Sequence, residues 1–273
     1  MPESAQLRKS VAAAGAAHVV RLPQAGHRPL VVPTGRWQGL VVGVVGGCGG
    51  AGASVLAAAL ARTAASPQSR AGVTLLAEID QLGGGLDLLL GAEDEPGLRW
   101  PDLASARGRL LPGSLSGTLP VIDGVHVLAA VRSGPVTGLS AAAVQAVLDA
   151  ARSEYGLVVL DLPRHLDEAA RAAVRAAHVC LVVVPADVRA TAAARRVVAS
   201  LRPEVDDVRV VVREPGPAGI AADGICAALD LPLAGLLPTE PRLRLALDRG
   251  EPPGLRPRGP LAAFCRELLE ELR

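Results

Sequence analysis

The sequence predicts an α/β protein with a mostly parallel central sheet and helices on both faces. Strand-like and helix-like segments alternate along most of the chain. Several strand candidates are unbroken apolar runs, which are typical of parallel strands buried on both faces. The first of these runs leads into a glycine-rich loop and then a helix. With 273 residues, 50% of them hydrophobic, the chain is long enough for one main domain around a large core.

The glycine-rich stretch lies in the first strand–loop–helix unit of the chain. Residues 40–45 are an apolar strand, and the alanine- and leucine-rich residues 54–65 after the glycines have helical spacing. A second buried strand is predicted at residues 73–79 and ends at Asp80. Because the carboxyl ends of parallel strands meet at one edge of a sheet, the glycine loop and Asp80 are expected at the same edge.

An irregular segment and a hairpin follow. Residues 92–117 are rich in Pro, Gly and Arg and contain one short predicted helix, residues 102–106. The Asp-Gly pair at 123–124 predicts a tight turn between strands at residues 118–122 and 125–129.

The second half of the chain continues the alternation. Apolar runs predict strands at residues 156–163, 178–184, 208–212 and 232–236. Apolar residues at helical spacing predict helices at residues 139–153, 167–177, 190–201, 220–229, 242–247 and 261–272. The polar face of the last helix is slightly acidic, so this helix is expected to pack on the core and not to bind a membrane.

Residues 1–36 are expected to form an N-terminal arm and linker ahead of a main domain of residues 37–273. A helix at 4–14 and a strand at 17–22 resemble the last helix–strand step of a receiver-type domain. About twenty residues cannot form such a domain alone, so the alternative is an arm packed on the main domain.

Composition excludes several functional classes. The net charge is +1 with acids and bases scattered, which does not favour direct nucleic-acid binding. The sequence contains neither an apolar run of membrane-spanning length nor a signal-peptide pattern, so a cytoplasmic location is expected. The four cysteines lack metal-ligand spacing and are expected to be reduced thiols.

The glycine-rich loop is the main candidate for a binding site. A strand, a glycine loop and a helix start in this order present backbone N–H groups to phosphate. The residues expected to bind a nucleotide here are Gly47, Gly49, Gly50, Ala51, Gly52, Ala53, Ser54 and Val55. Against the pattern G-x-x-x-x-G-K-[ST], Ala53 replaces the lysine and Ser54 supplies a hydroxyl for Mg²⁺.

The same glycines also fit the G-x-G-x-x-G pattern of dinucleotide-binding folds. The acidic residues at the strand ends must therefore distinguish a P-loop NTPase from a dinucleotide-binding protein. In a dinucleotide fold Glu78 or Asp80 would bind the ribose. In a P-loop NTPase, Asp161 at the end of strand 156–163 would hold the metal together with Ser54. The alternative roles are structural: Asp161 would cap the following turn and Asp80 would bond loop amides. The glycine loop and both acids in this order favour the NTPase fold.

The chain resembles the MinD/ParA branch of deviant P-loop ATPases over residues 39–273. CGGAGAS stands where the family has KGGxGK[ST], EID where it has D-x-D, and VVLDLP where it has its D-x-P metal strand. Within that branch the loop ending Gly-Ala-Ser is most similar to the CpaE/TadZ group, whose actinobacterial members are encoded beside pilus-type secretion genes and include proteins described as septum-site determining. The resemblance implies the SIMIBI/MinD-like fold, a homodimer, ATP or ADP with Mg²⁺, and protein partners in a pilus, secretion or division apparatus.

The departures from the family bear on mechanism. Ala53 replaces the phosphate-binding lysine and Cys48 the signature lysine, and Lys9 is the only lysine in the chain. Asp80 maps to the family's water-orienting aspartate, which does little without the cations, so ATP hydrolysis is expected to be weak or absent. Arg164 and Arg189, each near a strand end, are the candidates for a replacement cation, although a solvated surface role is favoured for both.

The base side of the site also departs from the family. The adenine-contacting asparagine is missing and Arg213 and Glu214 stand there, which leaves main-chain groups of residues 237–241, Pro238 among them, to hold a purine. The expected function is a MinD-, CpaE- or TadZ-like localisation scaffold. Two alternatives stay open: an active ATPase that uses arginine, and an NAD(P)-dependent oxidoreductase.

Overall fold

The computed structural model describes residues 39–69, 71–131, 138–214 and 219–272. The predicted N-terminal arm and its receiver-like helix and strand lie outside the described residues. The boundary of the main domain at residue 37 therefore stays a prediction.

The predicted mostly parallel sheet is confirmed, with eight strands in the order β3-β4-β2-β5-β1-β6-β7-β8. Only the β3–β4 pair is antiparallel. The strands are β1 (Leu40–Gly46), β2 (Thr74–Glu78), β3 (Val121–Ile122), β4 (Val125–Leu128), β5 (Leu157–Leu162), β6 (Val179–Pro185), β7 (Val208–Arg213) and β8 (Leu233–Leu237). β1, β2, β5 and β6 lie in the middle of the sheet and are buried almost throughout, which explains their unbroken apolar sequences.

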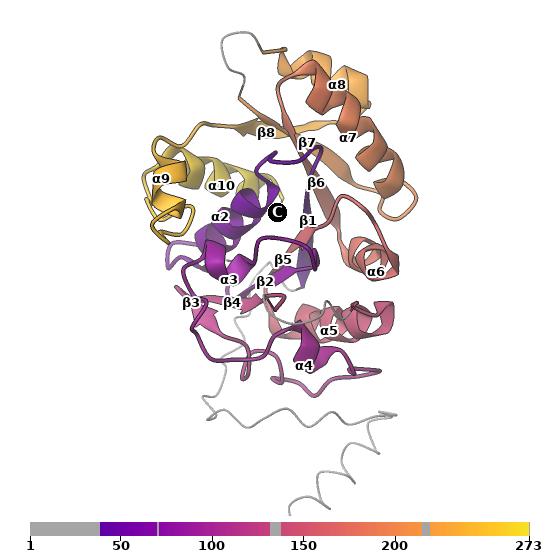
Figure 1. The fold of residues 1–273 in the computed structure, drawn as a ribbon, viewed down its shortest axis with the longest axis vertical. Helices are drawn as coiled ribbons and strands as arrows, with labels where there is room; N and C mark the ends of the chain where they lie inside the picture. Colours follow the sequence, from indigo (N-terminus) through magenta and orange to yellow (C-terminus); the bar gives the residue numbers. More distant parts are fainter. Residues whose placement is uncertain (1–38, 70, 132–137, 215–218, 273) are drawn as a thin grey trace, which may run out of the picture.

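Helices cover both faces of the sheet (Figure 1). One face buries α2 (Ala53–Ala65), α3 (Leu86–Leu89) and α10 (Pro260–Glu271). The other buries α4 (Trp100–Leu103), α5 (Ala141–Glu154), α6 (Glu168–Ala176), α7 (Val188–Leu201) and α8 (Ala222–Leu229). The short helix α9 (Leu243–Leu247) has no buried residue and lies at the rim. The polar N-caps Ser140, Asp167 and Asp187 each accept a hydrogen bond from the first turn of α5, α6 and α7.

The segment between β2 and α5 is where the sequence prediction was least accurate. The hairpin turn is confirmed, since Asp123 and Gly124 have φ of 48° and 84°, as a type I′ turn requires. However, β3 has only two residues, α4 begins two residues earlier than predicted, and α3 was not expected. Pro101 in the first turn of α4, and Asp102, which accepts a hydrogen bond from the Arg99 amide at 2.8 Å, account for the earlier start.

The prediction that the last helix packs on the core is confirmed. The apolar side of α10 is buried against α2 and the sheet, so this helix belongs to the core. His178 accepts a hydrogen bond from the Val41 amide at Nδ1, 2.9 Å away, and is a partner of the backbone. Within the described residues, every helix is too short or too polar to cross a membrane.

His126 on β4 predicts a pH dependence of stability. Burial lowers the pKa of this side chain from 6.5 to about 4, and its ring lies edge-on to Tyr155 at 5.2 Å between centroids. Between these two pH values the unfolded chain binds a proton at His126 and the folded protein does not, so acid favours unfolding. We expect the free energy of unfolding to fall as the pH drops from 6.5 towards 4.

Urea unfolding of His126→Gln at several pH values tests this expectation. The variant should lose part of the stability decrease that the wild type shows over this range. His165→Gln, at an exposed histidine, is the control and should keep the wild-type profile. An identical pH profile for His126→Gln and the wild type would contradict the assignment.

Candidate functional site

The glycine-rich loop between β1 and α2, residues 47–54, has the backbone of an anion site; we call it the phosphate loop. Gly50 and Gly52 have φ of 70° and 100°, a conformation that side-chain-bearing residues rarely adopt. The first hydrogen bond of α2 runs from the Leu56 amide to the Gly52 carbonyl at 2.9 Å. The amides of Ala53, Ser54 and Val55 thus have no partner inside the helix and are available to a phosphate at its N-terminus.

Close packing fixes the start of the phosphate loop. A Cβ atom added to Gly47 would lie 2.7 Å from Cβ of Ala194 on α7 and 3.0 Å from Cγ2 of Val184 on β6. The Gly47 amide also donates to the Val183 carbonyl at 2.8 Å. Only glycine allows this approach, so the sequence keeps Gly47 for space and Gly50 and Gly52 for backbone conformation.

The two predicted metal ligands meet at this edge of the sheet. Ser54 at the start of α2 lies beside the carboxyl group of Asp161, which is 5% exposed at the end of β5. The pKa of Asp161 is raised to about 7, mainly by burial; the neighbouring Ser54 side chain opposes this rise, and nearby Glu78 and Asp80 contribute to it. A hydroxyl and a buried carboxylate are oxygen donors of the kind that Mg²⁺ prefers, so the residues present fit this ion. Within the described residues, no backbone amide donates to the Asp161 carboxylate, as the alternative role of capping the next turn would require.

Glu78 and Asp80 at the end of β2 are both engaged by backbone amides. Glu78 is 1% exposed and accepts hydrogen bonds from the amides of Gly85, Leu86 and Ala130. Burial raises its pKa, and the backbone bonds oppose that effect. Asp80 accepts a bond from the Leu82 amide at 3.0 Å, the structural role that the sequence offered as its alternative. Its role in orienting water stays a prediction.

The strand order bears on the dinucleotide alternative. β1 pairs with β5 and β6, and β5 separates it from β2. In a dinucleotide-binding sheet, β2 lies next to β1 and its terminal acid reaches the ribose. Here the strand beside β1 ends in Asp161, and Glu78 is occupied by the backbone, so the arrangement matches a P-loop NTPase.

Two arginines lie against the phosphate loop. Arg213 at the end of β7 donates from Nη1 to the carbonyls of Gly50 and Ala51, at 3.1 and 3.3 Å. Arg164, after β5, is exposed, but a Cβ added to Gly49 would lie 3.8 Å from its Nη2. The sequence favoured a solvated role for Arg164; in the structure this exposed side chain also borders the loop. Arg189 is exposed near the start of α7, as expected.

The base side of the site is occupied in part by Glu214. Its amide donates to the Leu237 carbonyl at 2.9 Å, and its carboxylate accepts from the Thr239 amide at 3.3 Å. Pro238 lies between these groups, directly after β8. Some of the main-chain groups expected to hold a purine are therefore already bonded.

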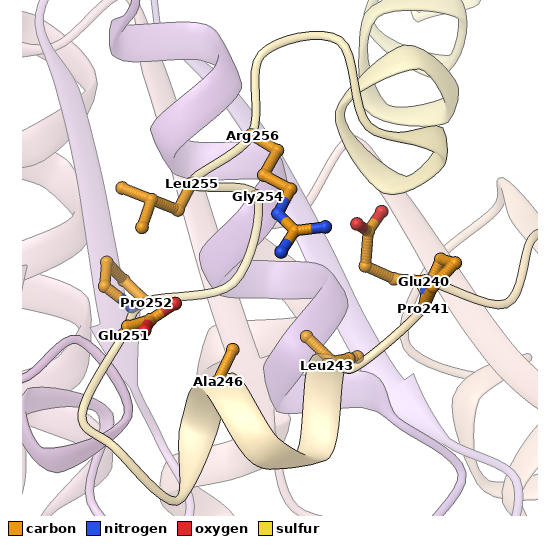
Figure 2. A pocket seen from close by; sticks show the side chains of 9 residues that line it. All are labelled: Glu240, Pro241, Leu243, Ala246, Glu251, Pro252, Gly254, Leu255 and Arg256. Atoms are coloured by element: carbon orange, nitrogen blue, oxygen red, sulfur yellow. The ribbon is translucent and has the colours of Figure 1, made fainter.

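A pocket beside α9 is too small for a purine. Figure 2 shows it between α9 and the chain that follows this helix. It holds about 30 Å³, room for little more than a water molecule. It is lined by Glu240, Pro241, Leu243, Ala246, Glu251, Pro252, Gly254, Leu255 and Arg256.

The comparisons with known proteins agree with this geometry. No family model matches the chain. It is 41% identical over 263 residues to "Uncharacterized protein Rv3660c" of Mycobacterium tuberculosis, covering 93% of this chain and 72% of that protein.

Solved structures with the same fold include a ParA family ATPase from Chlorobium tepidum TLS. It has a TM-score of 0.74, 17% identity, and covers 85% of this chain and 98% of that one. The septum site-determining protein MinD from Pyrococcus horikoshii OT3, complexed with Mg-ADP, has a TM-score of 0.70 and 18% identity. The match covers 85% of this chain and 95% of that one.

Proposed function

Because the chain belongs to the same protein family as Rv3660c of Mycobacterium tuberculosis and has the fold of the MinD and ParA ATPases, we propose that it positions a larger assembly within the cell. The assembly is a pilus or secretion machine or the division septum, and the chain acts there as a CpaE- or TadZ-like localisation scaffold in the cytoplasm. The name of the Pyrococcus neighbour, a septum site-determining protein, supports a role of this kind.

One observation carries the proposal: the phosphate loop keeps its backbone and loses its lysines. Gly50, Gly52 and the free amides at the start of α2 form an anion cradle. Ala53 and Cys48 stand where the family has cations that stabilise the charge developing on the transferred phosphoryl group. One such group is commonly worth about 3 kcal/mol of transition-state stabilisation, so hydrolysis is expected to be weak or absent.

Nucleotide is the expected ligand of the cradle, with reduced affinity. Ser54 and Asp161 would hold Mg²⁺, which would neutralise phosphate charge when bound. Bound ATP or ADP would then regulate assembly through binding, without supplying energy by hydrolysis. The ADP and magnesium present in the Pyrococcus structure support this ligand class.

A second candidate is an active ATPase that uses arginine as its cation. The position of Arg164 beside Gly49 favours it. Asp80 would then orient the attacking water, and its bond to the Leu82 amide would have to leave one carboxylate oxygen for that role.

The edge of the sheet that carries the phosphate loop is also the proposed contact face of a homodimer. Leu82, after β2, is 83% exposed and Val188, at the start of α7, is 71% exposed. Both follow strands whose carboxyl ends meet at this edge. Large apolar side chains exposed to this degree favour contact with a protein surface.

Turnover and binding measurements separate the scaffold from the ATPase. We expect the wild type to release phosphate from Mg-ATP no faster than Asp80→Ala, while ATP or ADP raises its melting temperature. Turnover well above that of Asp80→Ala would contradict the scaffold and favour the ATPase. A shift with NAD or NADP and none with ATP would instead favour an oxidoreductase.

A fluorescent fusion tests the localisation itself. We expect foci at a pole or septum that coincide with pilus, secretion or division components recovered with the tagged chain. A uniform distribution, with no such components recovered, would contradict the role in positioning.

A further inference from the structure

An open groove lies beside the phosphate loop. It encloses about 420 Å³ between the loop, the segment after β5 and the middle of α7. We call it the arginine groove, and its lining is Gly47, Arg164, Ala192, Ala193, Arg196 and Val197. The two alanines leave the space, and the packing of Gly47 on Ala194 holds α7 against the loop.

The groove presents two positive charges that no acid of the described residues neutralises. Arg164 and Arg196 are both exposed, and within the described residues neither forms an ion pair or hydrogen bond. By contrast, Arg171 and Arg175 on α6 are paired with Glu204 at 2.5 and 2.7 Å. The two arginines of the groove are therefore available to a ligand.

The nearby carboxylates are already in use. Asp167 and Asp187 each accept a hydrogen bond at 2.8 Å from the first turn of α6 and α7, as N-caps. Asp161 is buried beside Ser54. A guanidinium binds the oxygens of phosphate through paired hydrogen bonds, which an ammonium does not reproduce, so two arginines beside an anion cradle suit a phosphate-type ligand.

We propose that the arginine groove binds a phosphate-type oxyanion and, when a nucleotide occupies the cradle, receives its terminal phosphate. This assignment rests on the proposed nucleotide binding for the source of the anion. The groove's own chemistry would equally suit the end of a free inorganic polyphosphate. Arg164, which borders Gly49, makes the nearer contact, and Arg196 holds the outer oxygens. The groove would thus distinguish ATP from ADP without the two lysines.

Calorimetric titration of the full chain with tripolyphosphate, ATP and ADP tests the proposal. Arg164→Gln and Arg196→Gln should each weaken tripolyphosphate binding by at least about fivefold, as for the loss of one charge-assisted hydrogen bond near solvent. Arg195→Gln is the matched control, because Arg195 is an exposed arginine on α7 that does not line the groove. Arg164→Lys should restore only part of the affinity.

The outcomes separate the groove from the proposed function. Loss of ATP affinity with unchanged ADP affinity in Arg164→Gln would identify the terminal phosphate of a nucleotide as the ligand. Tripolyphosphate binding that needs both arginines, without any binding of ATP or ADP, would support the groove and contradict nucleotide binding. A wild type that binds no tripolyphosphate, or variants that bind it as Arg195→Gln does, would overturn the proposal.

Discussion

Replacing Ala53 by lysine is expected to strengthen Mg-ATP binding by about tenfold or more. Ala53 is the first residue of α2 and follows Gly52, whose left-handed backbone turns the chain into the helix. A lysine here would place an ammonium group beside phosphates already held by the amides of the loop. A hydrogen bond to a charged group contributes roughly 1.5–3 kcal/mol net, which corresponds to about tenfold to a hundredfold in affinity.

Titration of ATP into Ala53→Lys and Ala53→Met measures this effect. Methionine has a chain of similar length without the charge, so it controls for filling the loop. We expect a gain for lysine alone. Unchanged affinity in Ala53→Lys, with both variants folded, would show that the loop is closed or differently shaped in solution and would remove the basis for the anion cradle.

Replacing Trp100 by alanine is expected to destabilise the protein by about 3–5 kcal/mol, the usual cost of deleting a buried large aromatic side chain. Trp100 is 0% exposed and is among the largest fully buried side chains of the described residues. Its Nε1 donates to the Glu78 carbonyl at 2.5 Å, and its amide donates to the Ala129 carbonyl at 3.2 Å. The side chain therefore supports the end of β2, from which Asp80 projects.

Guanidinium unfolding of Trp100→Ala and Trp100→Phe separates packing from the hydrogen bond. Phenylalanine keeps most of the volume and loses the donor, so we expect it to cost about 1–3 kcal/mol. Leu245→Ala, at a side chain on α9 that is 47% exposed, should stay within about 0.5 kcal/mol of the wild type. A loss below about 1 kcal/mol in Trp100→Ala would contradict the buried position of this residue.

Local sequence signals were accurate where neighbouring residues decide the structure. The apolar runs predicted the strands that lie in the middle of the sheet, and the glycine loop predicted the cradle at the start of α2. The Asp-Gly pair predicted the turn between β3 and β4. By contrast, α3 has only four residues and its first amides, those of Gly85 and Leu86, are held by the distant Glu78, so no periodic pattern could reveal it.

The candidate site likewise depends both on local sequence signals and on contacts between distant segments. The sequence paired Ser54 and Asp161 as metal ligands, from a loop and a strand end more than 100 positions apart, and the fold places them side by side. Arg196 was not singled out at all. Its position in the sequence could have revealed it. Arg196 lies one helical turn after a run of alanines, in a helix that follows a central strand.

The sequence by itself determined the α/β class, the glycine loop and the absence of lysine beside it, because each of these is a property of consecutive residues. Only the tertiary structure decided that β5 lies between β1 and β2, that Glu78 is occupied by backbone amides, and that Arg164 and Arg196 line one groove with Gly47 of the loop. Strand order and the approach of distant loops depend on long-range packing, and a local pattern does not encode which distant segment will pack against it.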